Sequence, residues 1–277
     1  MLESFIFENH KGQRFIGRDV GVYLNYNDLR DYSWSYDTIN NKISRFYRSM
    51  RDRKLPLVVA GKTEEEAIAA RNRLLEIAEA DIEARLPGKI YIGEYYTNGY
   101  ITAGEVSNYL ISKRVCNINL TFTSDDPAWY REKVYPFLST ADSTGTTVGG
   151  TSDFPYDYPY DYAVALVGQR IVADSASESA YRLRIYGAAT DPAIVISGHT
   201  YAVKGNVGGG ESLLIDSLTK TITLTTATGG KENWFDKRVR ESYIFKGIPP
   251  GDNVVSWNGD FGFELTVIEK RSAPKWT

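Results

Sequence analysis

Residues 55–88, LPLVVAGKTEEEAIAARNRLLEIAEADIEARLPG, place an apolar run directly before the clearest helix signal in the chain. LPLVVA is a short, continuous apolar run that Gly61 interrupts, which is typical of a buried strand. Thr63 and Glu66 form a capping box, in which a hydroxyl and a carboxylate accept hydrogen bonds from free backbone N–H groups at a helix start. The sequence therefore predicts a strand followed by a helix that begins at Thr63.

The predicted helix is amphipathic and ends at Pro87-Gly88. Its acidic first turn, Glu64 to Glu66, suits the positive end of the helix dipole. Apolar residues recur along it at helical spacing, which predicts one buried stripe that lies against a sheet. The stripe consists of Ile68, Leu75, Ala78 and Ile82, and Arg71, Arg73, Glu76 and Glu79 lie largely off it.

Short strands are predicted on both sides of this helix. SFIFENHKGQRFIG at 4–17 predicts two strands around an Asn-His-Lys-Gly turn, and KIYIGEYYTNGYITAGEV at 89–106 predicts a hairpin that turns at Asn98-Gly99. The alternation in RVCNINLTF at 114–122 predicts a half-buried strand. Strands, one helix and further strands indicate a small α+β domain over residues 1–138.

A change of composition marks a domain boundary after this unit. Residues 139–153, STADSTGTTVGGTSD, are mostly Ser, Thr and Gly, which predicts a flexible linker. FPYDYPYDY at 154–162 then repeats Pro-Tyr-Asp-Tyr. Because proline has no N–H, this segment is excluded from a central strand and favours an extended or edge conformation. Its tyrosines offer contact area for docking the segment on a neighbouring surface.

Residues 154–277 have the pattern of a second, all-β domain. Strand-like stretches alternate with Gly, Asn, Asp and Pro turns at a spacing of about 8–12 residues, which indicates a sandwich or barrel. Within it, LLIDSLTKTITL at 213–224 predicts a hairpin over Asp216 to Lys220. The fold class predicted for the whole chain is mainly β, with an α+β first domain and a β-sandwich second domain.

Composition limits the classes of function. The 277 residues carry a net charge of −3, so no strong positive field exists to hold nucleic acid or anionic lipid by charge alone. Aromatic residues are abundant, with 20 Tyr, 11 Phe and 5 Trp, which suits half-buried sheets and protein interfaces. The single cysteine, Cys116, favours a buried structural thiol. The sequence shows neither a signal peptide nor a membrane span.

Catalytic and metal-binding patterns are weak. The two histidines, His10 and His199, lie in apparent turns, and no serine sits in a Gly-x-Ser-x-Gly elbow. No Cys/His or Asp/Glu spacing indicates a metal, and we expect no cofactor. The Gly-rich run NVGGGES at 206–212 lacks the Lys-Ser/Thr of a phosphate loop and reads as a turn between strands. These observations favour a protein without catalytic machinery.

Three carboxylates leave a glycosidase open as an alternative. Asp125, Asp126 and Glu264 provide the residue type that glycoside hydrolysis requires. However, adjacent residues of a strand point to opposite faces, so Asp125 and Asp126 do not flank one bond if the strand continues. The Asp126-Pro127 pair favours the end of a strand and a turn.

Basic and aromatic residues provide candidate contact sites. SRFYRSMRDRK at 44–54 has the mixture seen in single-stranded nucleic-acid binders, although a solvated strand face or a subunit contact is favoured. Trp234 and Trp257 suit either stacking on a sugar ring or a place in a core or interface. The candidate contact residues for a carbohydrate or a protein partner are Trp234, Trp257, Tyr156 and Tyr160.

Several stretches together resemble the distal tail proteins of siphophages and their prophages. In the first half these are YDTINNKISRFYR at 36–48, PLVVAG at 56–61, the capped helix, KIYIGEYY at 89–96 and TFTSDDPAWY at 121–130. In the second half they are FPYDYPYDY, RLRIYGAATDPAIVISGHTY at 182–201, LLIDSLTKTITL and the closing segment 244–276. The resemblance extends over essentially the whole chain.

The resemblance implies a structural hub of the virion tail rather than an enzyme. It implies a ring-forming N-terminal belt domain, β-barrel-like with one helix, that assembles as a hexamer between tail tube and tail tip. It also implies a galectin-like or carbohydrate-module-like C-terminal sandwich that docks baseplate or receptor-binding parts. The alternative is a cell-wall carbohydrate-binding module without catalysis, which requires an exposed aromatic platform on that sandwich.

Overall fold

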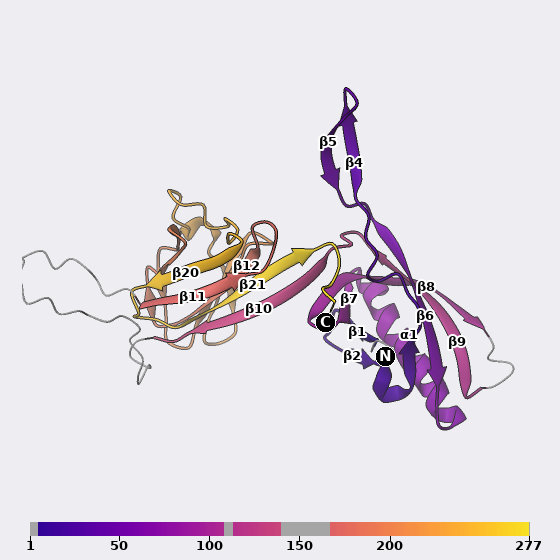
Figure 1. Ribbon diagram of the computed structural model, residues 1–277. Coiled ribbons are helices and arrows are strands. Elements are labelled where there is room, and N and C mark those ends of the chain that lie inside the picture. The colour runs from indigo at the N-terminus through magenta and orange to yellow at the C-terminus, as the bar shows by residue number, and fades with distance from the viewer. Residues whose placement is uncertain (1–4, 108–112, 140–166, 277) are drawn as a thin grey trace, which may run out of the picture. The chain divides into compact units, whose positions relative to one another are not determined.

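The computed structural model describes residues 5–107, 113–139 and 167–276. The chain forms two compact units: unit 1 contains Met1–Arg131 and Lys270–Thr277, and unit 2 contains Glu132–Glu269. Strands dominate both units, and α1 is the single α-helix among the described residues, so the prediction of a mainly β fold is confirmed (Figure 1). The predicted linker, except Ser139, and the Pro-Tyr-Asp-Tyr repeats lie outside the described residues.

The chain passes between the units within strands rather than within the predicted linker. Strand β10 (Trp129–Phe137) leaves unit 1, and strand β21 (Phe263–Arg271) returns to it. Residues 132–138, which the sequence assigns to the first domain, therefore belong to unit 2. The physical reason is packing, because the Phe137 ring stacks on Phe263 with a centroid separation of 4.4 Å inside the core of unit 2.

Unit 1 contains one helix and a curled antiparallel sheet. Its elements are β1 (Ile6–Glu8), β2 (Arg14–Ile16), a 3-10 turn (Gly17–Val20), β3 (Val22–Leu24), β4 (Ser35–Ile39), β5 (Lys42–Tyr47), β6 (Arg51–Ala60), α1 (Glu64–Ala84), β7 (Gly88–Ile92), β8 (Tyr95–Ser107), β9 (Val115–Ser124) and the start of β10. The strand order is β3-β6-β9-β8-β7-β1-β2, and β10 pairs with β8 at Tyr130 and Tyr96. Strands β1 and β2 flank the Asn-His-Lys-Gly turn as predicted.

Strand β8 joins the two halves of this sheet, and it replaces the turn predicted at Asn98-Gly99. The first part of β8 pairs with β7 and the second part pairs with β9. The β7–β8 turn lies earlier, at Gly93 (φ +57°). A Cβ atom on Gly99 would lie 2.6 Å from the Phe122 ring and 2.4 Å from the Thr123 carbonyl oxygen. Gly99 therefore permits the close approach of two strands, whereas the sequence pattern favoured its role in a turn.

Helix α1 begins and ends at the predicted signals. The Thr63 hydroxyl accepts a hydrogen bond from Glu66 N at 3.2 Å, and Glu66 Oε2 accepts one from Lys62 N at 2.9 Å. The helix ends at Ala84, where Arg85 adopts a left-handed conformation two residues before Pro87. These contacts confirm the predicted start and termination of the helix.

The buried face of α1 differs from the predicted stripe. Ile68, Leu75 and Ile82 are 37%, 45% and 45% exposed, so the prediction that they face the sheet is wrong. The buried residues are Ala67, Ala70, Leu74, Ile77, Ala78 and Asp81. They share a core with Leu57, Ile118 and Phe122 of the sheet. Both apolar stripes have helical spacing, and the small alanines allow the close approach of helix and sheet that decides between them.

The buried carboxylate of Asp81 fixes the β1–β2 turn to the end of α1. Asp81 Oδ1 accepts a hydrogen bond from His10 N at 2.8 Å and lies 2.6 Å from His10 Nδ1. The Asp81 side chain is fully buried, and a Cβ atom on Gly88 would lie 2.2 Å from its Oδ2. His10 thus has a structural partner within unit 1.

Unit 2 is a β-sandwich. Its further strands are β11 (Val167–Ala173), β12 (Ala180–Tyr186), β13 (Ala189–Thr190), β14 (Ala193–Ile196), β15 (His199–Ala202), β16 (Asn206–Val207), β17 (Ser212–Asp216), β18 (Thr221–Thr225), β19 (Lys231–Asn233) and β20 (Gly251–Trp257), with a 3-10 turn at Phe235–Lys237. One sheet has the order β19-β18-β17-β12-β21-β10, and the facing sheet has the order β11-β20-β14-β15. The predicted hairpin over Asp216 to Lys220 is present as β17 and β18.

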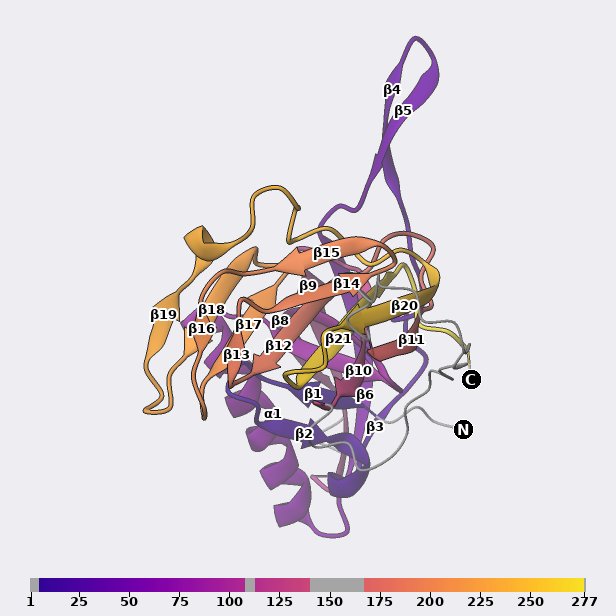
Figure 2. The same ribbon diagram turned by 90° about the vertical axis from the view of Figure 1, so that its left-hand side faces the viewer.

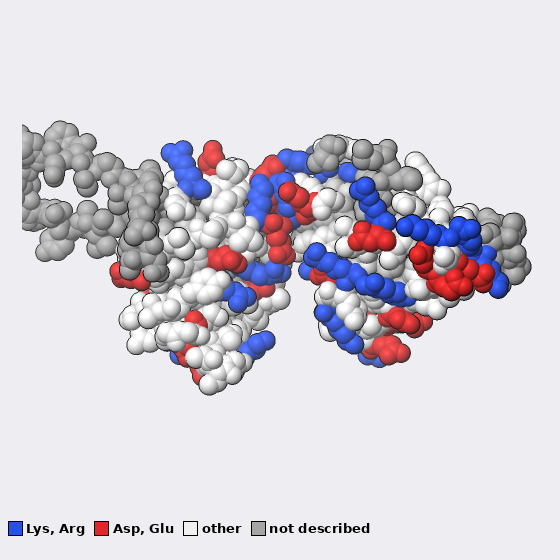
Figure 3. Space-filling model, turned by 90° about the horizontal axis from the view of Figure 1, so that it is seen from below, with Lys and Arg blue, Asp and Glu red and all other residues white. Residues whose placement is uncertain are grey.

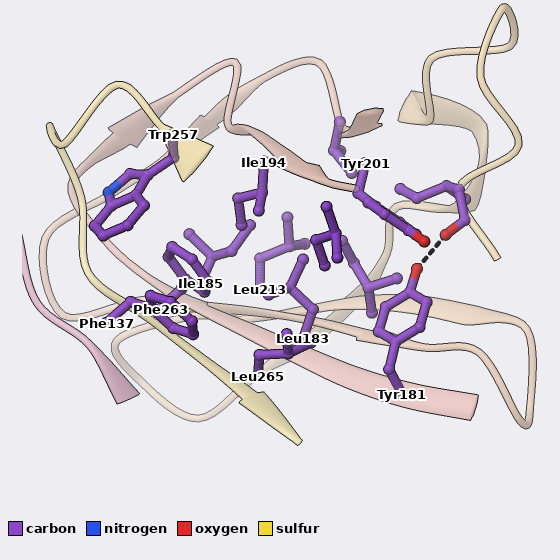
Figure 4. Close-up of a cluster of buried hydrophobic side chains, with 14 of the residues drawn as sticks. Phe137, Tyr181, Leu183, Ile185, Ile194, Tyr201, Leu213, Trp257, Phe263 and Leu265 are labelled. Carbon is purple, nitrogen blue, oxygen red and sulfur yellow. Dashed lines mark hydrogen bonds between the residues drawn. The ribbon is translucent and has the colours of Figure 1, made fainter. Parts of the chain in front are cut away.

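The core of unit 2 lies between these sheets (Figure 4). Figure 4 shows Leu183, Leu213 and Leu265 of one sheet facing Ile194 of the other. At one end of the core Tyr201 packs against Tyr181, whose hydroxyl donates a hydrogen bond to the carbonyl of Ile244. Apolar contacts between the two sheets stabilise the sandwich, and a buried polar group such as the Tyr181 hydroxyl is hydrogen-bonded.

The orientation of α1 predicts that alanine substitutions at two adjacent leucines change the unfolding free energy by very different amounts. We expect Leu74→Ala to destabilise unit 1 by about 2–4 kcal/mol, because it leaves a cavity between helix and sheet. Leu75→Ala should change the unfolding free energy by no more than about 0.5 kcal/mol, because its side chain is largely in solvent. Urea unfolding of the two variants measures the difference. Equal destabilisation by both substitutions would contradict the observed orientation of the helix.

Candidate functional site

Strands β4 and β5 form a two-stranded hairpin that projects from the rest of unit 1 (Figures 1 and 2). Its tip consists of Asn40 and Asn41, which both have positive φ values of 50° and 59°, as the favoured two-residue hairpin turn requires. A register shift lies between Asp37 and Thr38. Neither strand pairs with a third strand among the described residues.

One side of the hairpin is apolar and uncovered. Tyr36 pairs with Phe46, their ring centroids lie 6.4 Å apart, and each residue is 58% exposed. Thr38 and Ile43 form the next pair on the same side, and Ile43 is 51% exposed. We call Tyr36, Ile43 and Phe46 the apolar face of the hairpin. Because an isolated two-stranded hairpin is marginally stable in water, this face favours a contact with another surface.

The opposite side of the hairpin is mainly charged. Asp37 pairs with Arg45, whose guanidinium lies 5.7 Å from the centroid of the Tyr47 ring. Lys42 pairs with Ile39 next to the tip. The basic run predicted as a solvated strand face or subunit contact therefore supplies one strand of an exposed hairpin, although Arg53 at its end is buried.

A second uncovered apolar surface lies on α1. Ile68, Leu75 and Ile82 repeat every seven residues along the outer side of the helix, and we call these three residues the helix stripe. Exposed acidic side chains lie beside it: Glu76, Glu79 and Glu83. Within unit 1, this stripe and the hairpin are two separate surfaces of different shape.

Charged side chains of both signs are interspersed over the remaining surface that Figure 3 shows. On the face drawn there, Lys and Arg side chains lie among Asp and Glu without a broad field of one sign. This distribution agrees with the small net charge of −3. No helix among the described residues is both long and apolar enough to cross a bilayer.

The structure places the two candidate tryptophans in the interior of unit 2. Trp257 is 1% exposed, and its Nε1 donates a hydrogen bond to the carbonyl of Phe261 at 3.0 Å. Trp234 is 4% exposed, and Lys237 Nζ lies 3.4 Å from the centroid of its ring. Both rings are therefore covered, which counts against a sugar-binding platform built on them. Tyr156 and Tyr160 lie outside the described residues.

Two of the carboxylates considered for glycosidase chemistry, Asp125 and Asp126, have structural contacts in unit 1, and Glu264 lies in strand β21 of unit 2. Strand β9 ends at Ser124, as the Asp126-Pro127 pair predicts. Asp126 Oδ2 accepts hydrogen bonds from Tyr130 Oη at 2.5 Å and Lys270 Nζ at 2.7 Å. Burial raises the pKa of Asp126, but the bonds from Lys270 and Tyr130 outweigh it and hold that pKa below its usual value. A carboxylate held ionised in this way anchors the C-terminal segment to unit 1.

The remaining reactive residues are also in structural positions. His199 Nε2 lies 2.9 Å from the carbonyl oxygen of Tyr243, and Cys116 is buried in β9 as predicted. The described residues contain no group of three or more His, Cys, Asp or Glu side chains that could hold a metal ion. The surfaces that stand out are therefore the hairpin and the helix stripe. The sequence predicted a solvated strand face or subunit contact at 44–54, but it indicated neither the hairpin nor the exposure of the helix stripe. The Asn40-Asn41 pair between two β-forming runs is the sequence signal that marks the hairpin.

Comparison with known proteins finds solved structures with a similar fold. No protein-family model and no curated protein matches the sequence. The fold is similar to the SPP1 Dit (gp 19.1) protein, whose structure is described as a paradigm of the hub adsorption apparatus in Gram-positive infecting phages. That likeness has a TM-score of 0.57 at 12% identity and covers 96% of this chain and 99% of the other.

A chain of the phage P2 baseplate in its activated conformation is similar as well. The TM-score is 0.59 for the structure with Ca and 0.60 for the structure with Sr, at 12% identity, and each alignment covers 99% of this chain and 100% of the other. The resemblance to distal tail proteins is thus confirmed at the level of the fold.

The ion pair of Asp126 predicts a dependence of stability on pH. Because its pKa lies below the unfolded value of about 4, the contribution is fully present above that pH and is lost as the pH falls toward the folded pKa. We expect Asp126→Asn to remove it at neutral pH, at a cost of no more than about 1 kcal/mol for this half-exposed pair. Urea unfolding of unit 1 from pH 7 down to about pH 3 measures the effect.

Asp236→Asn is the control, because it removes one exposed negative charge at a site in unit 2. The wild type should lose stability on acidification more steeply than Asp126→Asn does. If the stability of the wild type and that of Asp126→Asn fell equally steeply with pH, the anchoring role of Asp126 would be contradicted.

Proposed function

We propose that this protein is a non-enzymatic structural component of a phage tail, and that it acts as a distal tail hub. The observation that carries this proposal is the fold likeness to hub and baseplate proteins over 96–99% of the chain. The structural partners of the histidines and of Asp126, together with the burial of Cys116, agree with a scaffolding role. The protein is made in the cytoplasm of a host bacterium and resides in the virion tail.

We further propose that unit 1 is a belt domain that assembles six copies into a ring. A closed ring requires two different surfaces on each subunit, because its contacts run head to tail. The apolar face of the hairpin and the helix stripe are two such surfaces on one unit. In this arrangement, the hairpin of one subunit lies on α1 of the next.

The dimensions and charges of the two surfaces support this pairing. The helix stripe extends over about 21 Å, at about 1.5 Å per residue, and the hairpin strands extend over about 14 Å for β4 and about 17 Å for β5. Lys42 and Arg45 give the hairpin a positive edge, while Glu76, Glu79 and Glu83 give the helix a negative one. A two-stranded ribbon packed on a helix is a stable layer arrangement, and it covers the apolar residues of both.

In this proposal, unit 2 is the outward domain of the hub. Its sandwich would offer a docking surface for the tail tube protein, tail-tip proteins or a receptor-binding protein, through contacts made by folded strands and loops. We include the Pro-Tyr-Asp-Tyr segment, with Tyr156 and Tyr160, as a contact for such a partner.

Negative-stain microscopy and light scattering of the purified chain test the ring. We expect six-fold particles with a central opening, in equilibrium with smaller species on dilution. A chain that remains monomeric at every concentration, both alone and with a tail tube protein, would contradict the proposal.

Substitutions at the two surfaces test how the ring is built. We expect Phe46→Ser and Leu75→Ser each to raise the concentration needed for assembly by about tenfold or more, because each removes an apolar anchor from the contact. Leu218→Ser, at an exposed turn of unit 2, is the matched control and should leave assembly unchanged. Light scattering over a dilution series measures the change.

A charge exchange separates the pairing of surfaces from ring formation itself. Arg45→Glu and Glu79→Arg should each weaken assembly, and the double variant should recover part of the loss if these side chains lie in one contact. A wild-type ring that all these variants form equally well would exclude the hairpin-to-helix pairing and leave the ring in place.

A further inference from the structure

A cavity of about 220 Å³ lies in unit 1 at the base of the hairpin. Its walls come from the chain just before β4, from the β5–β6 connection, from Pro127 and from Ser272 near the C-terminus. Three arginines line it, Arg48, Arg51 and Arg53, together with four serines. Among the described residues that form its walls, none is acidic. The cavity thus has the composition of an anion site, with positive charge and hydroxyl donors.

Arg53 is the unusual member of this group because it is buried without enough partners. The residue has no exposed surface, and its Nη2 donates a hydrogen bond to the Pro127 carbonyl at 2.9 Å. Its Nε and Nη1 have no partner among the described residues. A buried guanidinium with unpaired donors is costly, because each lost hydrogen bond to water is uncompensated. A ligand with acceptor oxygens would remove this cost.

The charges around Arg53 do not neutralise it fully. Burial and, to a lesser extent, the charge of Arg51 lower the pKa of Arg53 to about 10, while Asp28 and Asp31 act in the opposite direction. The group therefore remains a cation at neutral pH. Asp28 Oδ1 already accepts a hydrogen bond from the backbone N of Lys54 at 3.0 Å. The ring centroid of Trp129 lies 5.8 Å from the guanidinium carbon of Arg53, and its buried indole Nε1 has no partner within the described part of the chain either.

The other polar groups of the cavity are held in place by existing contacts. The guanidinium of Arg48 lies 4.1 Å from the centroid of the Trp34 ring, and its Nη2 donates to Ser272 Oγ at 3.4 Å. The hydroxyl of Ser35, at the start of β4, lies 2.7 Å from the hydroxyl of Ser49, two residues after the end of β5. These contacts fix donors from several segments around one space. Arginines and hydroxyls arranged in this way match the acceptor oxygens of a phosphate-like group.

We propose that this cavity binds a small oxyanion of the phosphate or sulfate type. The volume admits such a group together with water, since one water occupies about 30 Å³. The anion would accept hydrogen bonds from the guanidinium groups and serine hydroxyls that line the cavity. Because the walls include both ends of the hairpin and the C-terminal segment, the bound anion would also tie these segments together. This site does not depend on the proposed tail function.

Thermal unfolding and titration calorimetry with inorganic phosphate test the site in the full chain. We expect a saturable rise in the unfolding temperature of unit 1 with phosphate, as mass action requires for a ligand that binds only the folded state. Sodium chloride at matched ionic strength should give a smaller and non-saturating effect. Sulfate should compete with phosphate, which identifies the oxyanion group as the feature that is bound.

Variants show whether the effect comes from this cavity. Arg51→Gln, which keeps a side chain of similar length, should weaken phosphate binding by at least about tenfold. Arg45→Gln removes the same charge from the hairpin outside the cavity and should leave binding unchanged. Arg53→Met tests the buried cation itself, and if this variant fails to fold, Arg48→Gln provides the second measurement.

Two results would overturn the proposal. One is an equal stabilisation by chloride and phosphate at the same ionic strength, which would indicate general screening. The other is phosphate binding that Arg51→Gln and Arg45→Gln weaken to the same extent. A cavity filled only by water gives no saturable phosphate titration in the wild type.

Discussion

Unit 1 depends on one long strand that belongs to two parts of a sheet. Strand β8 pairs first with β7 and then with β9, so it turns a row of short strands into a curled layer around α1. The close approach at Gly99 makes this possible, because any side chain there would collide with Phe122 and the Thr123 carbonyl. The helix then fills the inner side through alanines and two large aliphatic residues, Leu74 and Ile77.

The same layer leaves apolar area that unit 1 cannot cover by itself. A single helix has two sides, and only one of them can lie on the sheet, so the helix stripe remains in solvent. Among the described residues the hairpin has no third strand, and its aromatic pair Tyr36–Phe46 is exposed. Uncovered apolar surface of this extent is typical of proteins that work by contact with other proteins. The uncovered apolar surface of unit 1 therefore supports the proposed ring.

The base of the hairpin has a different chemical character. There the guanidinium of Arg53, a residue of β6, is buried and donates a hydrogen bond to the Pro127 carbonyl, and further arginines and serines line the adjoining cavity. A buried cation with two unpaired donors is a costly feature, whereas the Tyr181 hydroxyl and one oxygen of the Asp81 carboxylate have hydrogen-bond partners. If an oxyanion binds at this position, the stability of the hairpin base would depend on the phosphate or sulfate concentration of the solution.

The predictions that the structure confirms rest on sequence signals that act over a few residues. The capping box at Thr63, the turn after β1 and the hairpin over Asp216 to Lys220 each fix the backbone through neighbouring atoms. The mainly β fold class also follows from such local patterns. The order of short motifs along the chain indicated distal tail proteins, and the likeness to solved structures confirms this resemblance at the level of the fold. These features are encoded locally, so they are visible before any distant contact is known.

Other features were decided by contacts between distant parts of the chain. Ile68, Leu75 and Ile82 have a helical period as good as that of the buried residues, and only the position of the sheet selects between the two faces of α1. Asn98-Gly99 has the composition of a turn, yet packing against Phe122 places it within a strand. The sequence by itself determined where backbone elements begin and end, because hydrogen bonds within a few residues set those points. Tertiary structure alone decided which faces are buried and where Arg53 lies, because burial depends on what the rest of the chain brings alongside.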